Sequence, residues 1–179
     1  MLEQLIADIG NHKVILCIEA ADRYGNVAVQ MALEKKYLAR VATPMGDAFS
    51  LAHKGRREVG LTGAYTPTIS AVSNALALRR VKEVLLEQGF EVQPFNRRSA
   101  VRARRHLEDF IALVRFTGYD YATIRRACDL LIGNGTTAQL RVYVGREKVE
   151  ALNKLVWLKK IDRAQITPEC LKILALPER

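Results

Sequence analysis

Five arginines lie within nine residues of the chain without an intervening acid: Arg97, Arg98, Arg102, Arg104 and Arg105. Guanidinium groups donate paired hydrogen bonds to phosphate oxygens, and like charges at this density repel one another unless an anion lies nearby. The cluster therefore predicts a contact with the phosphates of DNA or RNA. The alternative is a solvated loop that Glu108 and Asp109 partly neutralise.

A second set of candidate contacts lies between residues 26 and 57. Val29 and Leu33 have helical spacing, which predicts a helix over residues 27–36 with these side chains inward. The outward positions are then Asn26, Ala28, Gln30, Met31, Glu34 and Lys35. Amide side chains can pair with adenine, whereas lysine and arginine suit phosphate. The residues expected to contact DNA in this segment are Asn26, Gln30, Lys35, Lys54, Arg56 and Arg57.

The surrounding elements would position these side chains as a winged helix does. Residues 2–9 form an amphipathic helix candidate that ends at Gly10 and Asn11. Residues 12–24 have helical spacing, although residues 14–18 could instead be a strand. After helix 27–36, strands are expected within 37–43 and around Phe49 and Leu51, joined by turn residues 44–47. In this order, a recognition helix precedes a hairpin whose tip reaches the DNA backbone.

This segment resembles the winged helix-turn-helix domains of bacterial transcriptional regulators and plasmid replication-relaxation proteins. The resemblance is carried by Val29, Leu33, residues 37–40 and residues 49–57, and it covers about a third of the chain. In those families a strand ending in Leu-Thr-x-x-Gly-Arg commonly leaves the wing, and residues 51–56 are similar, with Ala52 in place of the threonine. The resemblance implies non-enzymatic, sequence-preferring binding to double-stranded DNA that regulates transcription or plasmid or phage replication. Because residues 1–60 have a net charge of only +1, a protein-interaction adaptor is the alternative.

Residues 63–179 read as a linker helix followed by a basic α/β domain. Helices are expected over residues 69–88, 119–132 and 146–158, strands over 90–95, 110–116 and 139–144, and a last short helix begins at Thr167, Pro168 and Glu169. The fold class is therefore α+β, with a winged helix over residues 1–62. The second part resembles, loosely, the restriction-endonuclease-like domain attached to winged helices in replication-relaxation proteins.

A working nuclease site of that kind needs an acid on one strand and an acid-x-lysine pattern on the next, to hold a divalent metal. The expected strands 110–116 and 139–144 contain no acid, and Asp109 and Glu147 have the wrong spacing. We therefore expect a degenerate domain without catalytic residues, metal or cofactor. A metal-dependent nuclease is the alternative.

The charge, the cysteine content and the hydropathy of the chain limit its possible partners and cellular compartment. The chain has a net charge of +9 and a pI near 9.7, which favours an acidic partner; nucleic acid is the commonest one, and an anionic membrane surface is the rarer alternative. Cys17, Cys128 and Cys170 are dispersed and odd in number, so neither a disulfide framework nor a zinc site is expected. No signal peptide or membrane span is apparent, which predicts a cytoplasmic protein. The expected helix over residues 69–88 has more apolar positions than one buried face needs. We therefore expect that it also packs against a second copy of the chain and forms a homodimer.

Overall fold

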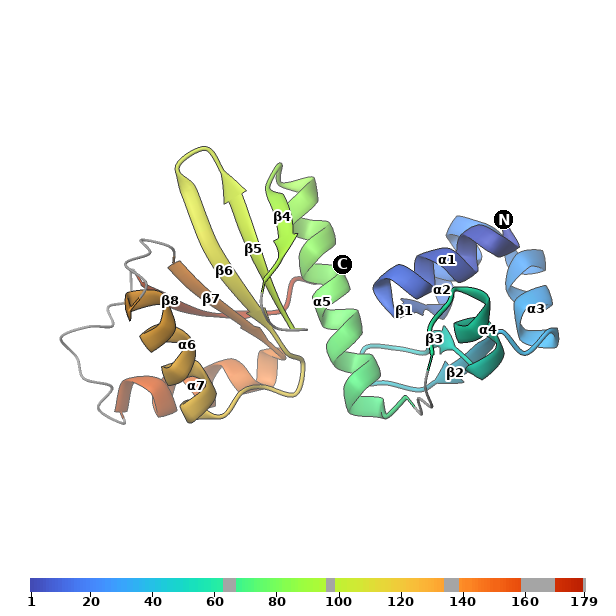
Figure 1. The fold of residues 1–179 in the computed structure, drawn as a ribbon. Helices are drawn as coiled ribbons and strands as arrows, with labels where there is room; N and C mark the ends of the chain where they lie inside the picture. Colours follow the sequence, from blue (N-terminus) through green and yellow to red (C-terminus); the bar gives the residue numbers. More distant parts are fainter. Residues whose placement is uncertain (63–66, 96–98, 134–138, 159–169, 179) are drawn as a thin grey trace. The chain divides into compact units, whose positions relative to one another are not determined.

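The computed structural model describes residues 1–62, 67–95, 99–133, 139–158 and 170–178. Within them the protein is a mixed α+β fold with seven helices and two sheets (Figure 1). The chain divides into two compact units, residues 1–76 (unit 1) and 77–179 (unit 2). In the described residues, none of the helices combines the length and the apolar character that a membrane crossing requires.

Unit 1 is built from helices and a small antiparallel sheet. Its elements are α1 (Leu2–His12), β1 (Val14–Leu16), α2 (Cys17–Tyr24), α3 (Asn26–Glu34), β2 (Leu38–Val41), β3 (Ala48–Leu51) and α4 (His53–Glu58). The strand order is β1-β3-β2, and β3 pairs with both neighbours. Residues 12–24, which the sequence left open, contain both a strand and a helix. Helix α1 continues past Gly10, which lies close to Val59, and the left-handed backbone follows at Lys13 instead.

The core of unit 1 explains why its elements form. Leu5 and Ile9 of α1 are fully buried, and they belong to one apolar cluster with Ile15, Ala32 and Phe49. Ile15 also faces Phe49 across the β1–β3 pairing. Burial of these side chains removes apolar surface from water, at about 25 cal/mol per Å², and it fixes which face of α3 points outward.

Unit 2 contains one five-stranded sheet. Helix α5 (Ile69–Glu87) begins in unit 1 and ends in unit 2, and it is followed by β4 (Glu91–Pro94), β5 (Ala100–Arg105), β6 (Glu108–Val114), α6 (Tyr121–Gly133), β7 (Gln139–Val144), α7 (Arg146–Leu158) and β8 (Leu171–Ala175). The strand order is β4-β5-β6-β7-β8. The first three strands are antiparallel, whereas β6, β7 and β8 are parallel and need the crossover helices α6 and α7.

The division between the units falls within α5. Val72 and Leu76 are buried in a cluster with Val14 and Ala48 of unit 1. The first two turns of α5 therefore pack in the core of unit 1 and belong to that unit. The sequence placed the boundary at residues 62 and 63, between the wing and this helix.

Three features of unit 2 differ from the sequence expectation. A strand, β5, crosses the basic stretch, because Val101 and Ala103 are buried while the arginines alternate with them. Strand β6 begins at Glu108, two residues before the expected start. The expected last helix is wrong at residues 171–175, which form β8 through parallel pairing with β7; Thr167, Pro168 and Glu169 themselves lie outside the described residues.

Candidate nucleic-acid interface

Helix α3 has one buried and one exposed face. It follows α2 through Gly25, whose φ of +80° suits glycine. Ala28, Val29 and Ala32 are buried, which corrects the outward position expected for Ala28. Asn26 and Gln30 are exposed, as the helical spacing predicted. Lys35 directly follows the helix and is also exposed.

The basic residues after β3 do not extend the hairpin but form the short helix α4. Lys54 and Arg57 are exposed on it, and the Lys54 ammonium lies 4.8 Å from the centre of the Tyr37 ring. Arg56 is partly buried and donates a hydrogen bond to the Thr62 carbonyl at 3.5 Å. The sequence expected these residues at the wing. The structure instead places them on a helix, and of the three it is Lys54 that contacts Tyr37 in the segment after α3.

A close backbone approach holds α4 in this place. The Tyr37 carbonyl accepts a hydrogen bond from the Ala52 amide at 2.8 Å. A Cβ added to Gly55 would lie only 2.2 Å from the same carbonyl oxygen. Glycine is therefore required at residue 55, and the contact couples α4 to the end of α3.

The tip of the β2–β3 hairpin is not basic. Residues 42–47 contain no lysine or arginine. Arg40 is the one cation of the hairpin, and its guanidinium pairs with Asp47, with Nε 3.1 Å from Oδ2. The hairpin itself consequently offers little to phosphate.

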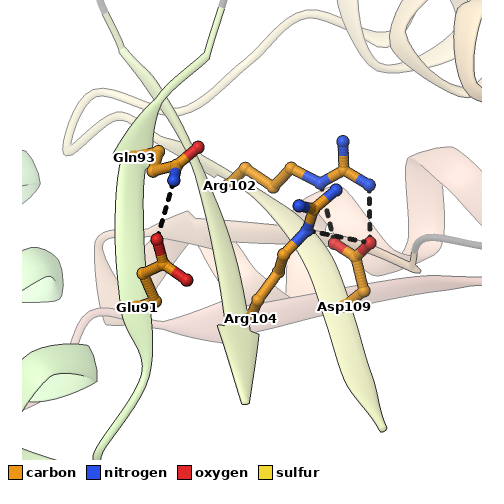
Figure 2. Close-up of polar contacts among 5 residues, drawn as sticks. All are labelled: Glu91, Gln93, Arg102, Arg104 and Asp109. Atoms are coloured by element: carbon orange, nitrogen blue, oxygen red, sulfur yellow. Dashed lines mark hydrogen bonds and ion pairs between the residues drawn. The ribbon is translucent and has the colours of Figure 1, made fainter. Parts of the chain in front are cut away.

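Three arginines of the cluster, Arg102, Arg104 and Arg105, lie on β5, which pairs with the strand β6 that contains Glu108 and Asp109 (Figure 2). Arg102 donates two hydrogen bonds to Asp109, at 2.9 and 2.5 Å, and Arg104 donates a third at 3.3 Å. On the adjacent strand β4, the Gln93 amide donates to Glu91 at 2.8 Å. Asp109 thus accepts from two arginines at once, as the dashed lines in Figure 2 show.

The remaining arginines of this sheet are also engaged. Arg105 donates to Glu108 at 2.8 Å and to the Gln88 carbonyl at 2.7 Å. Arg141 of β7, which the sequence analysis did not single out, lies 3.4 Å from Glu108 and stacks 3.7 Å from the centre of the Phe110 ring. These contacts favour neutralisation by Glu108 and Asp109 over a free phosphate site. The candidates Arg97 and Arg98 lie outside the described residues.

The ion pairs change the acidity of both carboxyl groups. The hydrogen bond from Arg102 lowers the pKa of Asp109, and the charges of Arg102 and Arg104 act in the same direction. The hydrogen bond from Arg105 lowers the pKa of Glu108. Because these pKa values are lower in the folded than in the unfolded state, the ionised acids stabilise the fold above their unfolded pKa values. That stabilisation is lost as the pH falls through the folded values.

Asp109→Asn should therefore reduce stability near neutral pH and not at low pH. The expected loss at pH 6 is below about 1 kcal/mol, since the pair is partly exposed. The stability difference should begin to shrink below about pH 3.9, the pKa of aspartate in the unfolded chain, and should disappear as the pH falls through the lower pKa of Asp109 in the folded protein. Urea unfolding from pH 2.5 to 7 would measure it. Glu150→Gln, on an exposed pair with Lys154, is the control and should leave the profile unchanged. Parallel curves for wild type and Asp109→Asn at all pH values would contradict the assignment.

The acids of the described residues do not form the metal-binding pattern of a nuclease. Strand β6 includes Glu108 and Asp109, but the residues two positions later are Phe110 and Ile111 rather than lysine. Glu147 lies against Gly145 at the start of its own helix. Across the part of the chain that the structure describes, no group of three His, Cys, Asp or Glu side chains could hold a metal ion.

Comparison with known proteins gives no further support for a function. No family model, no curated protein and no solved structure matches the chain.

Proposed function

We propose that this chain is a non-enzymatic protein that binds double-stranded DNA, and that unit 1 is a winged-helix domain. The observation that carries the proposal is the element order α1-β1-α2-α3-β2-β3 with sheet order β1-β3-β2. In a winged helix this order presents the third helix to the major groove. Here α3 is that helix, and its exposed face includes the amide side chains expected to read bases.

Phosphate contacts in this proposal come from residues beside α3. Lys35 follows the recognition helix, and Lys54 and Arg57 are exposed on α4. The Gly55–Tyr37 approach supports this grouping because it holds α4 against the end of α3. The hairpin contributes little, since Arg40 is paired with Asp47.

Unit 2 has a supporting role in the proposal. The arginines of β5, Arg102, Arg104 and Arg105, are paired with Glu108 and Asp109, so we assign them to stabilising the β5–β6 hairpin rather than to DNA. The degenerate restriction-endonuclease-like character and the cytoplasmic location stay predictions. A homodimer also stays a proposal, and the exposed apolar side chains Ile69 and Leu86 on α5 support it.

A series of salt concentrations tests whether the phosphate contacts come from α4 rather than from the arginines of unit 2. The full chain should bind a random-sequence duplex in fluorescence anisotropy, and the logarithm of its affinity should fall linearly with the logarithm of salt concentration, by about 0.9 per phosphate contact. Lys54→Ala and Arg57→Ala should each lower that slope by about 0.9.

Arg104→Ala is the matched control on unit 2, and it should leave the slope unchanged. If Arg104→Ala lowers the slope and the two α4 variants do not, the DNA contacts lie in the arginine cluster instead. Absence of binding at about 50 mM salt, where phosphate contacts should still hold, would refute the proposed function.

A further inference from the structure

Four exposed side chains of α3 form one stripe along the helix. Val27, Gln30, Met31 and Glu34 follow the spacing i, i+3, i+4, i+7, which places them on one side of a helix. All four are exposed, including the two apolar ones, Val27 at 75% and Met31 at 39%. We call these four residues the α3 stripe.

The α3 stripe has no cation. Lysine and arginine are the usual readers of guanine, whose major-groove edge offers only acceptors, and neither is present on the stripe. Adenine offers one acceptor and one donor, which an amide can satisfy together. Thymine presents a methyl group, and apolar side chains such as Val27 and Met31 contact such a group without a desolvation cost.

Glu34 holds the amide of Gln30 in one orientation. Gln30 Nε2 donates to Glu34 Oε1 at 3.2 Å. A carboxylate only accepts hydrogen bonds, so the amide nitrogen must face it. One N–H and the carbonyl oxygen of Gln30 stay available, and these are the two groups that adenine requires. Fixing the rotamer in advance reduces the entropy lost on binding.

We infer that α3 reads A·T base pairs in the major groove, with Gln30 on adenine, Val27 and Met31 on thymine methyl groups, and Glu34 as the residue that positions Gln30. The inference rests on the proposed function. It adds the base-pair class that the domain would prefer, which neither the topology nor the charge determines.

Base analogues in short labelled duplexes test each contact separately. The full chain should bind an alternating A·T duplex about tenfold more tightly than an alternating G·C duplex, the scale of one good amide–adenine pair. Replacing thymine by uracil removes only the methyl group and should weaken binding severalfold. Replacing adenine by 7-deazaadenine removes the N7 acceptor and should also weaken binding.

An I·C duplex tests which groove is read. It keeps the major-groove edge of G·C but has the minor groove of A·T, and it should bind as weakly as G·C.

Variants assign these effects to residues. Val27→Ala combined with Met31→Ala should abolish the difference between thymine and uracil duplexes while keeping the sensitivity to 7-deazaadenine. Gln30→Ala should abolish the sensitivity to 7-deazaadenine and keep the difference between thymine and uracil duplexes. Glu34→Gln should reduce the loss of affinity caused by 7-deazaadenine and leave the thymine–uracil affinity ratio unchanged. If Glu34 only stabilised the helix, both ratios would change together. Arg57→Ala should weaken binding to all duplexes alike.

Two different failures can be told apart. If no duplex binds, the proposed function is overturned, and the α3 stripe is better explained as a protein-binding surface. If duplexes bind but A·T and G·C are equal, or I·C behaves like A·T, or uracil has no effect, only the inference about α3 is overturned. Circular dichroism of each variant would verify that these exposed substitutions leave the fold intact.

Discussion

Gly55→Ala is expected to destabilise unit 1 by more than about 2 kcal/mol, at the upper end of overpacking effects, and to abolish DNA binding. The added Cβ would lie 2.2 Å from the Tyr37 carbonyl oxygen and 3.2 Å from Leu51 Cδ2. The carbonyl cannot retreat freely, because it accepts the hydrogen bond of the Ala52 amide at 2.8 Å. Relief requires α4 to move away from the end of α3, which would carry Lys54 and Arg57 with it.

Gly60→Ala separates this steric effect from the general cost of replacing glycine. Gly60 has a φ of +72°, but no heavy atom lies within 4 Å of an added Cβ. Its expected cost is the left-handed backbone alone, about 1–2 kcal/mol. Hydrogen exchange of peptides from residues 26–51 would report on unit 1 specifically. Equal exchange in the two variants would show that the close approach at Gly55 is not what holds α4.

The parts of the fold that the sequence predicted well are those with a local signal. Strand β7 and helix α7 were predicted with the bounds that the structure has, because alternation and helical spacing are properties of the segment itself. Strand β8 was missed, since its pairing with β7 involves residues about thirty positions away. Helix α4 was missed for a similar reason: it is six residues long and depends on contact with Tyr37.

The same distinction holds for the candidate site. The exposure of Asn26 and Gln30 followed from the period of α3. The pairing of the arginines did not, because it depends on the register of β5 against β6, in which Arg104 faces Asp109 and Arg105 faces Glu108. A signal for this hairpin was present: basic residues before and acidic residues after the two-residue connection at His106 and Leu107 are complementary across a tight turn. The sequence prediction assigned no strand to the arginine cluster and did not use this signal.

The same hairpin brings Phe110 into the core of unit 2, and Phe110→Ala is expected to cost about 3–5 kcal/mol, the range for truncating a buried aromatic ring. Phe110 is fully buried and packs edge-on against Phe90, with 5.3 Å between ring centres. The Arg141 guanidinium stacks on its face at 3.7 Å, and within the described structure Nε of this arginine has no hydrogen-bond partner. Removing the ring therefore leaves both a cavity and a partly buried cation without its aromatic contact.

Urea unfolding followed by the fluorescence of Trp157, the one tryptophan of the chain, would measure this loss in unit 2. Leu107→Ala, at the fully exposed turn of the same hairpin, should change stability by less than about 0.5 kcal/mol. The coupling of Phe110 to Arg141 is accessible through Arg141→Met, which keeps the length of the side chain and removes its charge. If the cation–π contact contributes, the double variant should be destabilised by less than the sum of the single variants. Strict additivity would mean that Phe110 stabilises unit 2 through packing alone, and that Arg141 is held by Glu108 rather than by the ring.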